Sequence, residues 1–426
     1  MQYGALQITF NTISDIPLDQ SVGFKLFSSI KEGLPYGYVN ILDRDSTFAE
    51  FPNLQIGADC SITIINVNDE EDKITFPTFK VLMIENSGSV LEDVFVGIIK
   101  VWFGHPWLLY KDIRNHAYKP TNSAELIKKI IRGEDRGMAF EADDKCFDKT
   151  DDSGVARYKI CETDWDFIQN KVLPYATVQQ LPTHFFCNAQ SQFYLRSFKN
   201  MYSENSKIIY IPSPGTLGDD KNMADIDKIC NDNNIDKDTG LFTIGESSVQ
   251  IGGFDMLKEI YPKFFFENLT NNSFIHGKKR VSNELKKKTG TSYGNLLPLD
   301  AQYMMEVQGT STKVLHNRQL LDSLSFLFEG AKSIDEMFTV TITSPFNGNH
   351  INIGNTANIY VPPIDTSVGN NKKHWLNGKW LTVALEHHTD DEDPRKIMTK
   401  STLVRPTFVG NDKSSSLTMS ALLYSS

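Results

Sequence analysis

One short pattern occurs twice in this chain, near its two ends. Residues 54–64 read LQIGADCSITI and residues 351–361 read INIGNTANIYV, and both fit [L/I]-x-I-G-x-x-x-x-I-x-[I/V]. In each copy a glycine (Gly57, Gly354) stands where a turn with positive φ would precede a strand. Antiparallel sheets can produce this pattern by coincidence. The alternative interpretation is that the chain folds two similar small β-barrels.

The parallel continues beyond the repeated pattern. FKVLMIEN (79–86) follows the first copy and WLTVALEH (380–387) follows the second, each with a polar turn and another strand-like run behind it. Three copies of a chain with two such barrels would place six similar barrels around one axis. Such a protein could match a sixfold ring on one side and a threefold object on the other.

Length and composition narrow the possible classes of protein. The 426 residues (48.2 kDa) predict two to four domains, and 27 Phe with 15 Tyr favour sheets. A net charge of −10 argues against sequence-specific nucleic-acid binding. The start lacks the features of a signal peptide, and the apolar run at 94–110 is interrupted by Lys100, His105 and Pro106, which argues against a membrane span. Five widely spaced cysteines are expected to be reduced and mostly buried.

The order of patterned segments predicts a mainly β fold with α+β insertions. Its parts are two similar small antiparallel β-barrel, tube-like domains and a helix-containing middle domain. Strand-like runs at 37–51, 54–67, 74–86 and 94–103 predict the first barrel. The middle domain has helices at 122–133, capped by Asn122, and at 163–176, capped by Thr163, followed by two strands around a turn at 188–192. A helix at 318–332 precedes four strand-like runs at 337–346, 351–361, 379–388 and 396–406. The predicted domains are 1–104, 105–202, a loop-rich insertion at 203–315, and 316–426.

Possible ligand sites are few. His387 and His388 stand near Asp390, Asp391, Glu392 and Asp393, but neighbouring residues on a strand point to opposite faces, so the two rings are not expected to share a metal. The segment 232–246 has alternating oxygen ligands, yet Lys237 occupies the place where a calcium loop needs glycine. The basic segment 277–290 could touch phosphate or an acidic partner, although a solvent-facing charge run is the simpler interpretation.

Catalytic patterns are also lacking in the sequence. It contains no G-x-S-x-G, H-E-x-x-H or phosphate-binding glycine loop. Asp164 and Asp166 fall in the first turn of a predicted helix, where the helix dipole accounts for them. Glu85 and Glu386 could pair as carboxylates in some folds, and Trp165 and Trp380 are expected to be core or interface anchors. We therefore assign no catalytic, cofactor-binding or metal-binding residue and no cofactor.

Four stretches in order resemble one known family. They are KVWFGHPWLLYKDIRNHAYKPTNSAELIKKII (100–131), TDWDFIQNKVLPYATVQQLPTHFFCNAQSQFYLRSF (163–198), RQLLDSLSFLFEGAK (318–332) leading into TVTI and INIGNTANIYV, and GKWLTVALEHHTDDEDPRKIMTKSTLVRP (378–406). In them the chain resembles the central baseplate hub proteins of contractile-tailed bacteriophages, which are related to the base of type VI secretion spike proteins. The stretches cover over half of the chain, and residues 203–310 match no part of the pattern.

The resemblance implies a structural protein without enzymatic activity. It implies a homotrimer whose six barrels join the sixfold tail tube to the threefold central spike and line the channel for genome ejection. The implied partners are the spike, tail-tube or tube-initiator proteins, and the tape measure and baseplate wedge, with only transient passage of DNA and no stable membrane association. The implied location is the virion tail baseplate, after assembly in the host cytoplasm. An acidic channel lining would fit the net charge, since it would repel phosphate. The alternative from another class is a β-rich carbohydrate-active tail enzyme that degrades cell wall or capsule.

Overall fold

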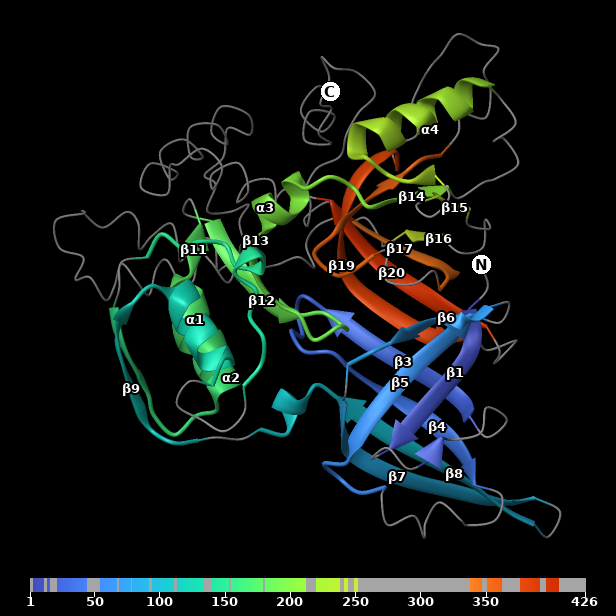
Figure 1. The fold of residues 1–426 in the computed structure, drawn as a ribbon, viewed down its shortest axis with the longest axis horizontal. Coiled ribbons are helices and arrows are strands. Elements are labelled where there is room, and N and C mark those ends of the chain that lie inside the picture. The colour runs from blue at the N-terminus through green and yellow to red at the C-terminus, as the bar shows by residue number, and fades with distance from the viewer. Residues whose placement is uncertain are drawn as a thin grey trace, which may run out of the picture.

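The fold consists mainly of β-strands, and most of them belong to one long, curled sheet (Figure 1). The computed structural model describes residues 3–10, 14–15, 21–43, 54–66, 69–77, 79–91, 94–110, 113–133, 139–152, 155–178, 181–211, 220–237, 241–243, 249–251, 338–346, 351–361, 376–390 and 396–405. Within these residues, 15 strands join in that sheet, and two smaller sheets of two and three strands stand apart from it. The mainly β fold that the sequence predicts is confirmed.

The first module is the half of the long sheet built from the N-terminal strands. Its strands are β1 (Tyr3–Phe10), β2 (Ser14–Asp15), β3 (Ser21–Ser29), β4 (Tyr36–Asp43), β5 (Asp59–Asn66), β6 (Asp69–Thr75), β7 (Phe79–Leu91) and β8 (Val94–Gly104). They pair in the order β3-β4-β8-β7-β5-β1-β2, with β6 beside β5, and each of these pairs is antiparallel. The sheet curls on itself, which hides the alternate side chains that point inward.

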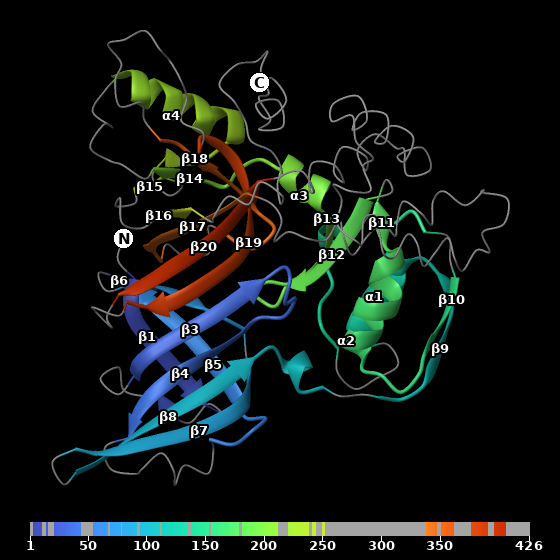
Figure 2. The same cartoon turned by 180° about the vertical axis from the view of Figure 1, so that it is seen from behind.

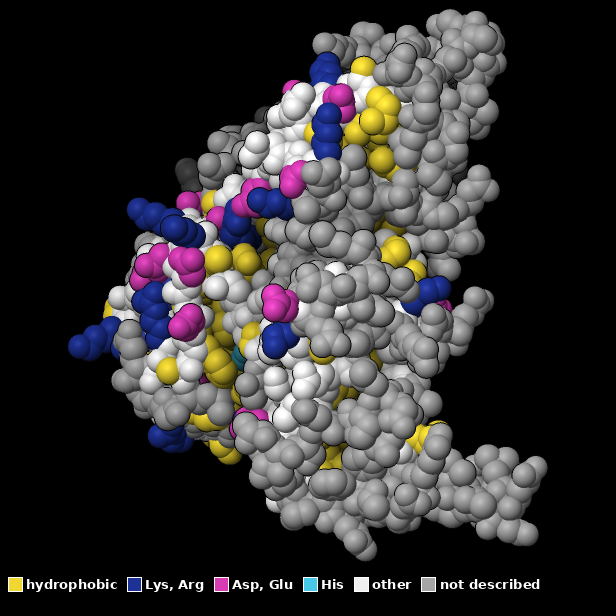
Figure 3. All heavy atoms as spheres, turned by 45° about the vertical axis from the view of Figure 1, so that its right-hand side comes forward, with side chains coloured by type: hydrophobic (Ala, Val, Ile, Leu, Met, Phe, Trp, Pro, Cys, Tyr) yellow, Lys and Arg dark blue, Asp and Glu magenta, His cyan; other side chains and the backbone are white. Residues whose placement is uncertain are grey.

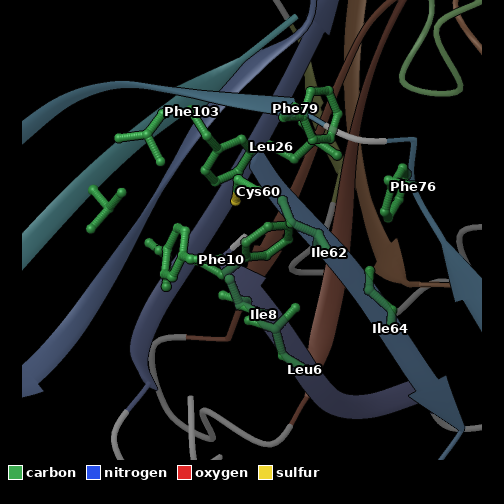
Figure 4. Close-up of a cluster of buried hydrophobic side chains, with 14 of the residues drawn as sticks. Leu6, Ile8, Phe10, Leu26, Cys60, Ile62, Ile64, Phe76, Phe79 and Phe103 are labelled. Atoms are coloured by element: carbon green, nitrogen blue, oxygen red, sulfur yellow. The ribbon is translucent and has the colours of Figure 1, made fainter. Parts of the chain in front are cut away.

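The core of the first module lies inside this curl (Figure 4). Alternate residues of β1 (Leu6, Ile8 and Phe10) and of β5 (Cys60, Ile62 and Ile64) are apolar and buried, as the two-residue period of a strand requires. Phe79, from β7, and Phe103, from β8, meet there with ring centroids 5.4 Å apart. Cys60 is buried among these groups, and burial raises the pKa of its thiol far above the ordinary range. The alternation read from the sequence therefore has a packing cause.

The second module is the other half of the long sheet. Its strands are β14 (Ile208–Ile211), β15 (Leu241–Thr243), β16 (Val249–Ile251), β17 (Phe338–Pro345), β18 (Thr356–Ile359), β19 (Gly378–Thr389) and β20 (Ile397–Arg405). They pair in the order β16-β17-β20-β19-β18-β14-β15. β14 runs parallel to both β15 and β18, which departs from the purely antiparallel arrangement expected for this half.

The core of the second module centres on Trp380, whose side chain is completely buried. Its indole N–H donates a hydrogen bond to the carbonyl of Leu376 at 2.8 Å. The guanidinium carbon of Arg405 lies 4.3 Å from the centre of its ring, a distance typical of cation–π contacts. Trp380 is thus a core residue, as one of the two predictions for it stated.

A middle region, from 105 to 203, packs beside the sheet (Figure 1). It has a core of its own, although Phe198 and Met201 near its end join the core of the second module. Its strands are β9 (His116–Thr121), β10 (Val155–Lys159), β11 (Thr177–Val178), β12 (Leu181–Cys187) and β13 (Phe193–Ser197). Its helices are α1 (Ser123–Ile131), α2 (Asp164–Phe167) and α3 (Phe198–Ser203). Single turns η3 (Pro106–Leu108), η4 (Asp144–Cys146), η5 (Ile168–Val172, a π-helix) and η6 (Leu173–Tyr175) connect them.

The predicted helix starts in this region are confirmed. The side chain of Asn122 accepts a hydrogen bond from the backbone N–H of Glu125 at 2.8 Å, and that of Thr163 accepts one from Asp166 at 3.1 Å. The second helix differs from the expected regular one, because after Phe167 it widens into the π-helix before the turn that contains Pro174. The predicted turn at 188–192 does connect β12 to β13, and the Asn188 side chain accepts hydrogen bonds from the N–H groups of Gln190 and Gln192.

The segment expected to be a loop-rich insertion contains regular elements. Besides β14 to β16 it holds the helix α4 (Asp220–Asn233), whose Ile226 and Cys230 pack with Ile235 onto Ile209 and Tyr360 of the second module. The helix expected at 318–332 and the basic segment 277–290 lie outside the described residues. The domain limits given above stay predictions.

None of the helices in the described ranges is long and apolar enough to cross a membrane. The five cysteines are free thiols: Cys60, Cys187 and Cys230 are buried, Cys146 is partly buried and Cys161 is exposed.

Candidate assembly surface

The repeated pattern folds into the same turn in both modules. Gly57 has a φ of +87° and Gly354 a φ of +84°. The N–H of Gly57 donates to the carbonyl of Val81 at 2.8 Å, and the N–H of Gly354 donates to that of Thr382, also at 2.8 Å. The N–H groups of Val81 and Thr382 return bonds of 2.9 Å to Ala58 and Asn355, the residues after the two glycines. The two segments are therefore similar in backbone geometry as well as in amino-acid sequence.

The strands around the two turns also correspond in order and register. The order β3-β4-β8-β7-β5 of the first module matches β16-β17-β20-β19-β18 of the second. One irregularity in pairing falls between Val81 and Met83 of β7, and its counterpart falls between Thr382 and Ala384 of β19. Such bulges are specific local features, so an equivalent bulge in both modules is a strong sign of a common plan. Two similar sheet modules in one chain, as predicted, are thereby confirmed.

A backbone junction joins the two modules edge to edge. Residues 384–388 of β19 pair antiparallel with residues 25–29 of β3, so that His387 lies opposite Leu26. Ile30 donates its N–H to the carbonyl of Val383 at 2.9 Å, and Lys25 forms an ion pair with Glu386 at 3.0 Å. Seen from behind, β20, β19, β3, β4, β8 and β7 follow one another as a single curved sheet (Figure 2).

The side of this sheet that points away from the two cores presents a mixed surface, which we call the outward face. Its residues alternate with core residues on each strand and are half-buried or exposed: Lys25, Phe27, Tyr36, Tyr38, Asn40, Met83, Glu85, Ile98, Lys100, Trp102, Glu386, His388, Lys400 and Thr402. Lysines lie opposite glutamates at equivalent positions, Lys100 opposite Glu85 and Lys400 opposite Glu386. The outward face therefore carries both signs of charge.

Aromatic rings form one end of the outward face. The rings of Phe27 and Tyr36 stack at 5.3 Å, and those of Tyr38 and Trp102 lie 5.0 Å apart. The Nζ atom of Lys100 lies 4.2 Å from the centre of Tyr38 and 4.1 Å from that of Trp102. The four rings are half-buried, and aromatic rings that are partly open to solvent on a regular sheet are typical of surfaces that bind another protein. Sequence reasoning missed this group, although the alternation in YGY (36–38) and KVW (100–102) indicates it.

The adjacent histidines point to opposite faces, as predicted. His387 is buried with Phe76 and Phe346, and its Nδ1 atom lies 2.9 Å from the Thr399 hydroxyl. Burial and, to a smaller extent, the neighbouring His388 lower the pKa of His387 to about 4. His388 lies on the outward face with its Nδ1 3.9 Å from a Glu386 oxygen. Asp391, Glu392 and Asp393 lie outside the described residues.

The other candidate ligands also have ordinary partners or are not described. No group of three or more potential metal ligands occurs in the part of the chain that the structure describes. In the segment 232–246, whose oxygen pattern partly matches a calcium loop, Lys237 forms an ion pair of 2.6 Å with Asp227.

The carboxylates considered for catalysis are held in structural contacts. Asp164 forms a buried ion pair with Lys159 at 2.9 Å, and Asp166 accepts a hydrogen bond from the Thr163 hydroxyl at 2.7 Å. Glu85 and Glu386 lie on separate strands of the outward face and do not come together. Trp165 packs on Trp107 and Phe185 in the middle region.

Basic and acidic side chains intermingle on another side of the molecule too. Figure 3 shows Lys and Arg beside Asp and Glu over the middle region, without a large patch of either sign on the described part of that view. Within the middle region, Lys128 and Arg132 each form an ion pair with Asp144. In the described parts of this view and of the outward face, basic side chains thus stand beside acidic ones.

Comparison with known proteins gives results for structure alone. No protein-family profile and no curated protein sequence matches the chain. Its fold is similar to that of the 43 kDa tail protein of prophage MuSo2 from Shewanella oneidensis, with a TM-score of 0.50, 10% identity, and coverage of 95% of this chain and 98% of that one. The fold is also similar to that of a tail protein from Neisseria meningitidis MC58, with a TM-score of 0.47, 11% identity, and coverage of 95% of this chain and 97% of that one. A third similar structure is a component of the type VI secretion system of E. coli, which is described as similar in structure to tail proteins of bacteriophage T4. Its TM-score is 0.43 at 10% identity, with coverage of 93% of this chain and 76% of that one.

Proposed function

We propose that this protein is a structural hub of a phage tail baseplate, in which three copies form a hollow ring. The observation that carries the proposal is the internal duplication: two modules with the same strand order, the same glycine turn and the same bulge. Three such chains place six similar modules around an axis, so the ring has approximate sixfold symmetry. Its exact symmetry is threefold, because it contains three identical chains. A ring of this kind can contact a sixfold tube at one end and a threefold spike at the other.

The fold supports this proposal, since the chain shares its fold along nearly its whole length with the MuSo2 tail protein. The identity of 10% supports no transfer of individual residues. The proposed partners are the central spike and the tail-tube or tube-initiator proteins, with the tape measure and baseplate wedge as further neighbours. The proposed location is the tail of the virion, after assembly in the host cytoplasm.

The outward face is the surface we propose for the channel lining. It is continuous across both modules, so three copies would surround a channel with six related sheets. It carries charges of both signs, with three lysines (Lys25, Lys100 and Lys400) and two glutamates (Glu85 and Glu386). The acidic lining expected from the net charge is therefore not part of the proposal. A lining of mixed sign gives DNA few fixed counter-charges, which suits passage without stable binding.

The mass of the assembled protein tests the ring. Purified protein measured by light scattering after size-exclusion chromatography, alone and with its spike partner, should give three times the chain mass of 48.2 kDa for the hub component. A monomer or dimer under both conditions would contradict the proposal.

We further propose that the hub has no enzymatic activity. Incubation with cell-wall and capsule polysaccharides should release no new reducing ends. Release of sugar that is lost in a Glu85→Gln or Asp164→Asn variant would instead establish the carbohydrate-active alternative.

A further inference from the structure

The junction between the two modules has a counterpart with no partner in the described chain. β19 pairs on one side with β20, and on the other side first with β18 and then, through residues 384–388, with β3. β7, its equivalent, pairs on one side with β8, and on the other side with β5 through Phe79 and Lys80. Beyond these two residues, no described strand pairs with the second side of β7. The open stretch, residues 83–87, is the equivalent of the stretch of β19 that pairs with β3.

The equivalent of β3 shows the same kind of open side. β3 lies between β4 and β19, whereas β16 pairs with β17 alone among the described strands. The chain therefore contains one completed junction, β19 with β3, and both halves of a second one, β7 and β16. Open strand edges carry unpaired N–H and C=O groups, which other chains can bind by adding a strand.

We propose that β7 of one copy pairs antiparallel with β16 of a second copy and so repeats the β19–β3 junction between subunits. This inference rests on the proposed function for the number of copies, which is three. It adds which edges meet and in which register.

The register follows from the internal pairing. In the first module, Leu26 lies opposite Gly37, and Gly37 lies opposite Phe103 on its other side. In the second module, Ile251 lies opposite Val340, and Val340 lies opposite Leu403. Because Phe103 and Leu403 are equivalent, Leu26 and Ile251 are equivalent too. In the same way Asn86 of β7 is equivalent to His387 of β19. Since His387 lies opposite Leu26, Asn86 should lie opposite Ile251 of the next copy. Ser87 should then lie opposite Gln250.

The order of the strands decides that the partner is another copy. β16 and β7 stand at the two ends of the run β16-β17-β20-β19-β3-β4-β8-β7, with six strands between them. A contact between two different surfaces of the same protein is heterologous. It produces a closed ring when the rotation from one copy to the next divides a full turn into a whole number of steps. Each copy would then satisfy one open edge on either side.

The two kinds of junction should differ in charge. Within the chain, Lys25 and Glu386 form an ion pair across the junction. The equivalent positions between copies are Gln250 and Glu85, which cannot form one. We therefore expect the contact between subunits to depend on backbone hydrogen bonds and to change little with salt concentration.

Cysteine cross-linking tests both the edges and the register. In a Cys146→Ser, Cys161→Ser background, which removes the two thiols that are not buried, a Ser87→Cys, Gln250→Cys double variant is oxidised. We expect covalent dimers and trimers on a denaturing gel, with an 87–250 link in the peptide mass spectrum. Mixing the two single variants should give the same link in dimers only. The matched control is Lys25→Cys with His388→Cys, the equivalent pair, which should link within one chain.

The outcomes separate this inference from the proposed function. A trimer by mass in which the control pair links but 87–250 does not would overturn the edge pairing and leave the hub intact. A link that forms equally well in a Ser89→Cys, Gln250→Cys variant would overturn the register. Protein that stays monomeric, with and without its spike partner, would contradict both. Hydrogen exchange of the unmodified protein gives an independent readout, since amides of 83–88 should exchange slowly in the trimer.

Discussion

The two modules have equivalent central strands but different surroundings. In the first, β5 pairs antiparallel with β1; in the second, its equivalent β18 pairs parallel with β14, onto which α4 packs. The shared part is thus a four-stranded sheet with its glycine turn and one following strand. The difference shows that these five strands are enough to define the register of the duplicated unit. The next strand in the sheet can run either antiparallel or parallel to them.

The two cores differ in polarity as well. The first is filled with aliphatic and aromatic groups around Cys60. The second places polar groups at equivalent depths, among them Arg405 over Trp380 and a hydrogen bond of 3.0 Å between Tyr210 and Ser401. Buried polar groups lose stability when one partner is removed, so we expect the second module to tolerate substitution less well.

The largest expected effect compares the equivalent core residues Trp380 and Phe79. Each is fully buried, so Trp380→Ala and Phe79→Ala should each cost about 3–5 kcal/mol of unfolding free energy. Trp380→Ala should lie at the upper end, because it also removes the hydrogen bond to the Leu376 carbonyl and the ring contact of Arg405. Chemical denaturation followed by circular dichroism measures both. Equal losses, or a larger loss for Phe79→Ala, would contradict the proposed difference between the cores.

The next effect concerns pH and the residue pair His387 and Asn86. His387 stays neutral in the fold, since burial lowers its pKa to about 4, whereas an unfolded histidine titrates near pH ~6.5. As the pH falls from about 6.5 to about 4, the unfolded state takes up a proton that the folded state does not, so up to about 3 kcal/mol of stability is lost. His387→Asn, which installs the residue of the first module, should flatten the pH dependence of the melting temperature in this range.

Part of that pH dependence should remain in the variant. His105 is also buried, and burial lowers its pKa to about 3, so its contribution has the same sign. An unchanged slope in His387→Asn would mean that the pKa of His387 is the same in the folded and the unfolded protein, which would contradict the effect of burial.

A smaller effect compares the two turn glycines. Both have positive φ, so Gly57→Ala and Gly354→Ala should each cost about 1–2 kcal/mol. An added Cβ meets no atom within 4 Å at Gly57 but lies 2.9 Å from the Phe186 ring at Gly354. Gly354→Ala should therefore cost about 1–3 kcal/mol more, as thermal or chemical unfolding would show. A Gly57→Ala variant that is as unstable as Gly354→Ala would mean that the two turns are not surrounded as described.

The smallest effect concerns the ion pair at the junction. Lys25 and Glu386 are partly exposed, so a double-mutant cycle with Lys25→Ala and Glu386→Ala should give a coupling of about 0.2–1 kcal/mol that decreases with salt. The matched cycle with Gln250→Ala and Glu85→Ala should give no salt-dependent coupling. A coupling well above this range would mean that charge, and not the backbone pairing, holds the modules together.

The sequence was sufficient for features whose cause is local. The turn glycines, the Asn122 and Thr163 caps and the opposite faces of His387 and His388 each depend on a few neighbouring residues, and all are confirmed. The β19–β3 junction was not predictable, because its partners are far apart in sequence; the hydrogen bond between Phe24 and Thr389 spans 365 positions. Helix α4 was missed since its sequence is polar apart from a few apolar residues such as Ile226 and Cys230, and it is stabilised by contacts with the second module.

The most direct test of the account is to image the protein in its native particle by electron cryomicroscopy. We expect it on the tail axis in three copies, with six similar sheet modules around a channel and the β7 edge of each copy beside β16 of the next. A single copy, a position away from the axis, or a ring in which the two modules occupy unrelated positions would contradict it.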